Sequence, residues 1–240
     1  MHSPFVFDFI LNVLNNKSRY NAPAQIEVVR QALLADQKTL QITDLGAGSR
    51  AGTSSKKTIS KLAQQALKPR KYAQVLYRTV KHYQPQRLIE LGTSLGITTA
   101  YLSAGNPKAT ITTIEGSPSI PVVARQNFKK LQAENIQLIE GNFDTILPSV
   151  LERIEHIDLA YVDGNHRYQP TLNYFHQLLT RSHHRTILIF DDIHWSAEME
   201  KAWAEIKTHP SVQYTIDIFF LGFVFFRLEF KVKQHFTIRF

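Results

Sequence analysis

The stretch RLIELGTSLG, residues 87–96, decides the fold class of this chain. An apolar run at 87–91 leads into two glycines four positions apart, Gly92 and Gly96, and a helical pattern begins at Ile97. Glycine lets the backbone approach a ligand where a side chain would collide. The stretch therefore predicts a strand, a ligand-binding loop and a helix, in that order.

The spacing of these glycines indicates the kind of ligand. The pattern G-x-x-x-G differs from the G-x-G-x-x-G of dinucleotide enzymes, so we do not expect a ligand with a pyrophosphate group. Glu115 ends the next apolar run, 25 residues after Glu90. A carboxylate at that place can accept both hydroxyls of a ribose. We therefore expect a ligand that contains a nucleoside.

From residue 87 onward, apolar runs alternate with helical patterns. This alternation is typical of an α/β protein with a doubly wound, mostly parallel sheet covered on both faces. The expected strands are 87–91, 110–115, 136–140, 157–163 and 186–191, and the expected helices are 97–104, 118–133, 144–153, 168–181 and 196–208.

The end of the chain breaks this alternation. Residues 212–220 and 223–230 are both β-rich, and only Leu221 and Gly222 separate them. Such a short link cannot make a parallel crossover, so it predicts an antiparallel hairpin. The tail, 231–240, alternates apolar and polar residues and is a candidate edge strand.

The N-terminal third is predicted to be mainly helical, because Ile26, Val29 and Leu33 recur at helical spacing. We divide the chain into an N-terminal helical extension at 1–84, which covers the ligand edge or meets a partner such as a second copy, and a Rossmann-like domain at 85–240. The apolar residues near the start have three interpretations: an acceptor pocket, a dimer interface or, by default, core packing. They are Phe5, Phe7, Phe9 and Ile10.

A second glycine-rich stretch, DLGAGSR at 44–50, also looks like a cofactor loop. It follows a short strand-like run at 40–43. A lysine-rich polar stretch comes next, with no second strand and no following acid. We therefore interpret 44–50 as a structural turn.

The formal charge of +8 is local. Between Asp44 and Glu90 there is no acidic residue, whereas ten basic residues lie there: Arg50, Lys56, Lys57, Lys61, Lys68, Arg70, Lys71, Arg78, Lys81 and Arg87. They form either a face for RNA or another polyanion, or a solvated helical surface. The second interpretation is favoured because no aromatic residues alternate with the charges.

With these residues in hand, residues 85–230 resemble the class I S-adenosylmethionine-dependent methyltransferases, in particular their small-molecule O-methyltransferase-like branch, and the whole chain looks like a bacterial subfamily of this fold. The resemblance rests on ELGTSLGIT at 90–98, Glu115, GNFD at 141–144, YVDGNHRY at 161–168 and IFDDIH at 189–194. It implies a seven-stranded sheet of order 3-2-1-4-5-7-6. It also implies that the cofactor is held by Glu90, Gly92, Thr93, Ser94, Gly96, Thr98, Glu115, Asn142, Phe143 and Asp163.

In the metal-dependent relatives, the fourth-strand Asp and an Asp-Asn pair bind magnesium, which matches Asp163, Asp191 and Asp192 here. The second residue of the pair is Asp192 rather than Asn, so the site is more negative than in those relatives. Three neighbouring carboxylates repel one another unless a cation, basic neighbours or protonation relieves them. A bound Mg²⁺ is the relief that the resemblance implies. The other interpretation of Asp191 and Asp192 is a turn or helix cap.

Methyl transfer needs a deprotonated acceptor, and two routes are visible. A divalent cation on the three carboxylates can lower the pKa of an acceptor hydroxyl. Alternatively His166 or His194 takes the proton, with Asp163 beside it. Each histidine alone also has a structural hydrogen-bonding interpretation.

Absent features narrow the function. The chain has no cysteine, which excludes thiolate nucleophiles. It also lacks an Asp/Asn-Pro-Pro-Tyr/Phe stretch, which argues against methylation of exocyclic base nitrogens. We expect an enzyme that O-methylates a small hydroxylated acceptor, with an RNA methyltransferase or a non-catalytic cofactor-binding module as alternatives. No segment is long and apolar enough for a membrane span or reads as a signal peptide, so we expect a cytoplasmic protein.

Overall fold

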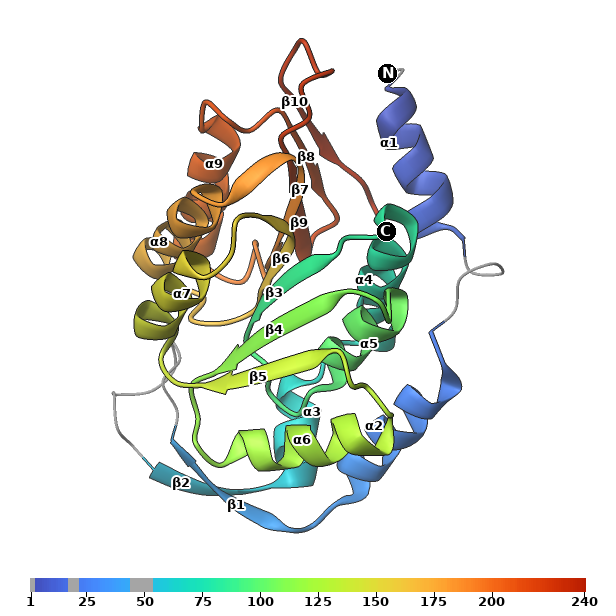
Figure 1. Cartoon of the computed structure of the whole chain (residues 1–240), viewed down its shortest axis with the longest axis vertical. Coiled ribbons are helices and arrows are strands. Elements are labelled where there is room, and N and C mark those ends of the chain that lie inside the picture. Colours follow the sequence, from blue (N-terminus) through green and yellow to red (C-terminus); the bar gives the residue numbers. More distant parts are fainter. Residues whose placement is uncertain (1–2, 17–21, 44–53) are drawn as a thin grey trace.

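The computed structural model describes residues 3–16, 22–43 and 54–240. Its centre is an eight-stranded sheet of order β10-β8-β9-β7-β6-β3-β4-β5 (Figure 1). The strands are β3 (Arg87–Leu91), β4 (Thr110–Glu115), β5 (Ile136–Glu140), β6 (Ile157–Val162), β7 (Ser182–Asp191), β8 (Tyr214–Asp217), β9 (Leu221–Phe225) and β10 (Gln234–Thr237). Only β9 runs antiparallel to its neighbours. The predicted order of seven strands is confirmed, and the tail adds β10 as a parallel edge strand.

The predicted turn of the C-terminal hairpin was misplaced. Leu221 and Gly222 belong to β9, and the link between β8 and β9 is 218–220, where Phe219 adopts φ +75°. Gly222 is needed for packing rather than for the turn, because a Cβ there would lie 2.7 Å from the ring of Trp203. The glycine that suggested a turn in the sequence is instead required by the packing of α9 against β9.

Helices cover both faces of the sheet (Figure 1). One face carries α7 (Phe143–Glu152), α8 (Tyr168–Leu179) and α9 (Ala197–Thr208), and the other carries α4 (Arg70–Tyr83) and α5 (Ile97–Gly105). Helix α6 (Ile120–Lys130) lies beside β5. Successive residues of a strand point to opposite faces. Ile89 and Leu91 therefore enter the core below α7–α9, whereas Leu88 packs below α4.

The N-terminal segment is only partly as predicted. Its helices are α1 (Pro4–Phe9), the π-helical η1 (Ile10–Leu14), α2 (Ala24–Ala35) and α3 (Ile59–Ala66), but β1 (Thr39–Thr43) and β2 (Ser54–Thr58) form an antiparallel hairpin. The sequence of β2, SSKKT, has no apolar alternation and therefore gave no strand signal. The glycine-rich stretch at 44–50 lies outside the described residues.

The N-terminal helices share the core of the sheet. Val75, Leu76 and Val80 of α4 belong to the same buried cluster as Leu88, and Phe9 packs edge-on against Phe223. Core packing thus accounts for Phe9, whereas Phe7 is exposed. The domain boundary at residue 84 stays a prediction.

The β1–β2 hairpin lies beyond the carboxyl ends of β4 and β5 (Figure 1). It therefore sits where ligands bind in parallel sheets. Among the described helices, none is both long and apolar enough to cross a membrane.

Candidate functional site

A cavity of about 490 Å³ opens at the carboxyl edge of the sheet. Loops that follow β3, β4, β5 and β6 form one side of it, and the N-terminal hairpin, α3 and the turn before β9 form the other. Its lining includes Ile42, Lys57, Leu62, Lys68, Gly92, Ser94, Glu115, Ser117, Asn142, Phe143, Asp163, Gly164, His166, Asp192 and Phe220. Five of the residues predicted to hold a cofactor lie together here with Asp163.

Gly92 sets the shape of the loop after β3. It adopts φ +102°, and a Cβ at this position would lie 2.0 Å from the carbonyl oxygen of Asp163. No side chain fits that gap, so only glycine brings the β3 and β6 loops together. Gly96 adopts φ +80° at the start of α5, where a Cβ would lie 2.6 Å from the ring of Phe128. The two glycines therefore serve the packing of the loop, and Gly92 alone lines the cavity.

Glu115 is fixed at the cavity wall by backbone amides. The N–H groups of Ser94 and Ser117 each donate to its carboxylate at 2.8 Å. The side chain is 8% exposed, and burial raises its pKa although these amides oppose the rise. Ser94 and Ser117 donate to different carboxylate oxygens and Gly116 adds a third backbone N–H, which leaves a lone pair of the carboxylate for a ligand. The carboxylate is thus oriented and can still accept hydroxyl groups from the cavity, as ribose binding requires.

Asn142 and Phe143 form the wall beyond Glu115. The side chain of Asn142 caps α7 by accepting the N–H of Asp144 at 2.8 Å. The ring of Phe143 packs over Gly164, where a Cβ would lie 2.7 Å from it. This aromatic face beside a glycine suits a flat ring such as adenine. The residues present thus fit the predicted nucleoside cofactor.

Four predicted cofactor residues are not among the described lining residues: Glu90, Thr93, Gly96 and Thr98. Glu90 shares a face of β3 with Leu88 and therefore points below α5 rather than to the edge. The hydroxyls of Thr99 and Thr113 donate to it at 2.5 and 2.6 Å. Burial raises the pKa of Glu90 to about 8 despite these two bonds. The expectation of direct cofactor contact by the Glu90 side chain is corrected to a core role.

The predicted metal ligands Asp163, Asp191 and Asp192 lie close together at the other end of the cavity. The hydroxyl of the buried Tyr161 is 3.0 Å from a carboxylate oxygen of Asp163 and of Asp191. The three acids thus come from the ends of adjacent strands, as expected. Their grouping agrees with the prediction, and a basic neighbour, one of the three expected kinds of relief, lies among them.

Lys68 lies among these carboxylates. It sits between α3 and α4, is 8% exposed, and forms an ion pair with Asp191 and a longer one of 3.6 Å with Asp192. Burial alone would lower the pKa of Lys68, but Asp191, Asp163 and Asp192 outweigh it and raise it to about 12. An ammonium therefore already supplies the positive charge. Mg²⁺ needs close octahedral oxygen coordination, so these residues do not fit it while Lys68 is in place.

The two predicted catalytic histidines have different surroundings. His166 lines the cavity, and its Nε2 lies 3.5 Å from Asp163. Burial alone would lower the pKa of His166, but Asp163 outweighs it, so the pKa is raised. His194 is bound by Asp217 at 2.8 Å and by Glu200 at 3.3 Å and is not among the lining residues. The geometry keeps His166 as a candidate base and corrects His194 to a structural role.

Sequence reasoning missed Lys68 because it was counted within the basic segment. The described part of that segment is not a single face. Lys68 and Arg78 are buried, and Arg78 donates to the backbone carbonyls of Val13 and Leu14, whereas Lys61 and Arg70 are exposed. The available signal was the charge of the three carboxylates, which required basic neighbours or a cation. An RNA partner stays a prediction.

Comparisons with known proteins agree with this fold. Residues 89–193 match a family described as "Methyltransferase domain". A search of curated proteins gave no match.

Solved structures share the fold at low sequence identity. They include an O-methyltransferase from Bacillus cereus in complex with SAH (18% identity, 92% of this chain and 97% of that chain, TM-score 0.63). Another is the O-methyltransferase TomG from Streptomyces achromogenes in complex with SAM (18% identity, 68% of this chain and 82% of that chain, TM-score 0.58). A third is the SAH-bound methyltransferase PaMTH1 from Podospora anserina (19% identity, 68% of this chain and 81% of that chain, TM-score 0.59). The Bacillus match extends well into residues 1–84, because it leaves only 8% of this chain uncovered.

The domain match and the shared fold together confirm the predicted resemblance to class I S-adenosylmethionine-dependent methyltransferases of the O-methyltransferase-like branch. Residues 89–193 thus resemble a methyltransferase domain, and the chain shares the fold of these solved methyltransferase structures.

Proposed function

We propose that the protein transfers the methyl group of S-adenosylmethionine to a hydroxyl oxygen of a small acceptor. The observation that carries this proposal is the cavity itself. Glu115, oriented by backbone amides, lies at one end, and His166 with Asp163 lies at the other. A nucleoside-binding acid and a proton acceptor thus face one cavity.

S-adenosylmethionine, when bound, supplies an electrophilic methyl group on a sulfonium sulfur. The chain must then align an acceptor oxygen and remove its proton. His166 in its neutral form accepts that proton, and the Asp163 carboxylate stabilises the imidazolium that results. The raised pKa of His166 means that turnover increases as pH rises through a value above 6.5.

The cavity end opposite Glu115 supports a small acceptor. Lys68, His166 and Asp192 line it together with the exposed Phe220. A phenol or catechol combines an apolar ring with a hydroxyl that these polar groups can bind. The described cavity offers no extended basic groove, which is why a small molecule is preferred to RNA as the acceptor.

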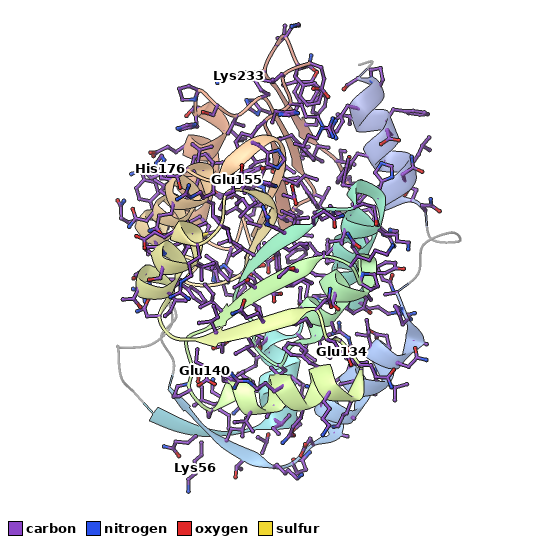
Figure 2. The ribbon with its side chains drawn as sticks, in the orientation of Figure 1. Lys56, Glu134, Glu140, Glu155, His176 and Lys233 are labelled. Carbon is purple, nitrogen blue, oxygen red and sulfur yellow. The ribbon has the colours of Figure 1, made fainter. Side chains whose placement is uncertain are left out.

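The first test is calorimetric titration of the protein with S-adenosylhomocysteine. Glu115→Ala removes the charged acceptor for the ribose hydroxyls, so affinity falls roughly ten- to hundredfold. Glu140→Ala is the matched control, because Glu140 ends the neighbouring strand β5 but is exposed and pairs with Arg125 (Figure 2). Equal affinities of the two variants, or absence of binding by the unaltered protein, would reject the proposal.

A further inference from the structure

The position of Lys68 makes it a permanent part of the three-carboxylate cluster. Pro69 follows it at the N-terminus of α4, and α4 is anchored in the core by Val75 and Leu76. Asp191 and Tyr161 point to the sheet face that α4 covers, because they follow Ile189 and Leu159 at spacings of two residues. The rigid packing of α4 on this face therefore delivers the Lys68 side chain to these acids.

The cluster is arranged for an ammonium rather than for a divalent ion. One carboxylate oxygen of Asp191 contacts both Lys68 and the Tyr161 hydroxyl, and Lys68 also reaches Asp192. Asp191 is fully buried, and burying an unpaired carboxylate is costly. A divalent ion at this place would meet the positive charge of Lys68 at contact distance. Lys68 and a metal ion are therefore alternatives.

We propose that Lys68 is the fixed cation of this cluster and takes the place that the sequence pattern assigned to a divalent metal ion. The protein accordingly carries its own counter-charge and needs no Mg²⁺ there. Lys68 has three N–H donors, of which Asp191 engages one, whereas Asp192 at 3.6 Å forms only a longer ion pair. Under the proposed function, a further N–H of Lys68 donates to the acceptor oxygen. The proposal that Lys68 takes the place of a metal ion does not depend on methyl transfer, whereas its role as a donor to the acceptor rests on the proposed function.

The test is a titration with Mn²⁺ followed by electron paramagnetic resonance, without cofactor or acceptor. All variants carry His183→Ala, because His156, Asp158 and His183 form a separate group of candidate ligands at the other edge of the sheet, with ligand atoms within 4.8 Å of one another. The unaltered cluster should leave the free Mn²⁺ signal unchanged. Lys68→Met should bind Mn²⁺ at least tenfold more tightly, and adding Asp192→Ala, which removes one oxygen ligand, should abolish that gain.

Lys61→Met is the matched control, since Lys61 is an exposed lysine on the preceding helix α3, and it should behave like the unaltered cluster. Mn²⁺ binding that is present with Lys68 and lost in Asp192→Ala would overturn the proposal. A folded Lys68→Met variant without gained binding would also overturn it. Circular dichroism reports whether that variant folds. If it does not fold, the comparison of the unaltered cluster with Asp192→Ala decides. Failure to bind S-adenosylhomocysteine would instead count against the proposed function.

Discussion

At one end of the cavity, the carboxylate of Glu115 is held by the backbone N–H groups of Ser94 and Ser117; at the other, Asp191 is held by the ammonium of Lys68. Both carboxylates are buried and need compensation. Amides leave Glu115 free to accept further hydroxyls from a ligand, whereas an ammonium neutralises Asp191. The two ends therefore differ in what they can bind: neutral hydroxyl groups at the first, and an oxygen that gains negative charge at the second.

The largest expected effect concerns the glycine that joins the two ends. Gly92→Ala places a Cβ 2.0 Å from the backbone of Asp163 and imposes φ +102° on alanine. We expect a loss of about 3 kcal/mol or more in the free energy of unfolding and loss of S-adenosylhomocysteine binding. Urea denaturation and calorimetry measure the two. Gly116→Ala is the control for the stability measurement alone, because Gly116 is outside the described positive-φ glycines but lines the cavity. If Gly92→Ala were as stable as the unaltered protein, the β3 and β6 loops could move apart without cost, and the prediction would be wrong.

Glu90 is a third buried carboxylate and lies away from both ends of the cavity, with neither amides nor an ammonium to compensate its charge. Glu90 has a pKa of about 8 when folded against 4.5 in its ordinary state, so the folded protein binds an extra proton between these values. Stability therefore falls as pH rises from 4.5 to 8. Glu90→Gln keeps an acceptor for Thr99 and Thr113 and removes this loss, which stabilises the protein by about 3 kcal/mol at pH 8.

Urea denaturation at pH 5 and pH 8 checks this prediction, with the gain expected only at the higher pH. S-adenosylhomocysteine binding should stay unchanged, since Glu90 does not line the cavity. A variant that loses cofactor affinity would return Glu90 to the cofactor site.

The smallest effect is expected at His194. Burial alone would lower its pKa, but Asp217 and Glu200 outweigh it and raise it. The stabilisation from this pairing is fully present below about pH 6.5 and is lost as pH rises through the raised value. His194→Asn should cost about 1 kcal/mol or less at pH 6 and less still at pH 8, by thermal denaturation. A large loss of cofactor binding instead would make His194 part of the site.

The fold was largely predictable because buried parallel strands leave a continuous apolar signal. The strands at 87–91, 110–115 and 136–140 were predicted with the bounds that the structure shows. The β1–β2 hairpin was not, because the polar SSKKT segment has no apolar alternation. Glu115, Asn142 and Asp163 line the cavity, and the sequence pointed to them because each ends a strand or begins the loop after it. Glu90 does not line the described cavity, since its side chain points to the face of β3 that α5 covers.

The fold class could be recognised in the sequence alone, because the glycine loop and the acids at strand ends are local features that each follow an apolar run. Only the tertiary structure decided what neutralises those acids. Lys68 lies 123 positions before Asp191, and α4 brings it to the cluster by packing on one face of the sheet. Two charged residues so far apart produce no periodic pattern in the sequence. Whether they meet depends on which helix covers which face of the sheet.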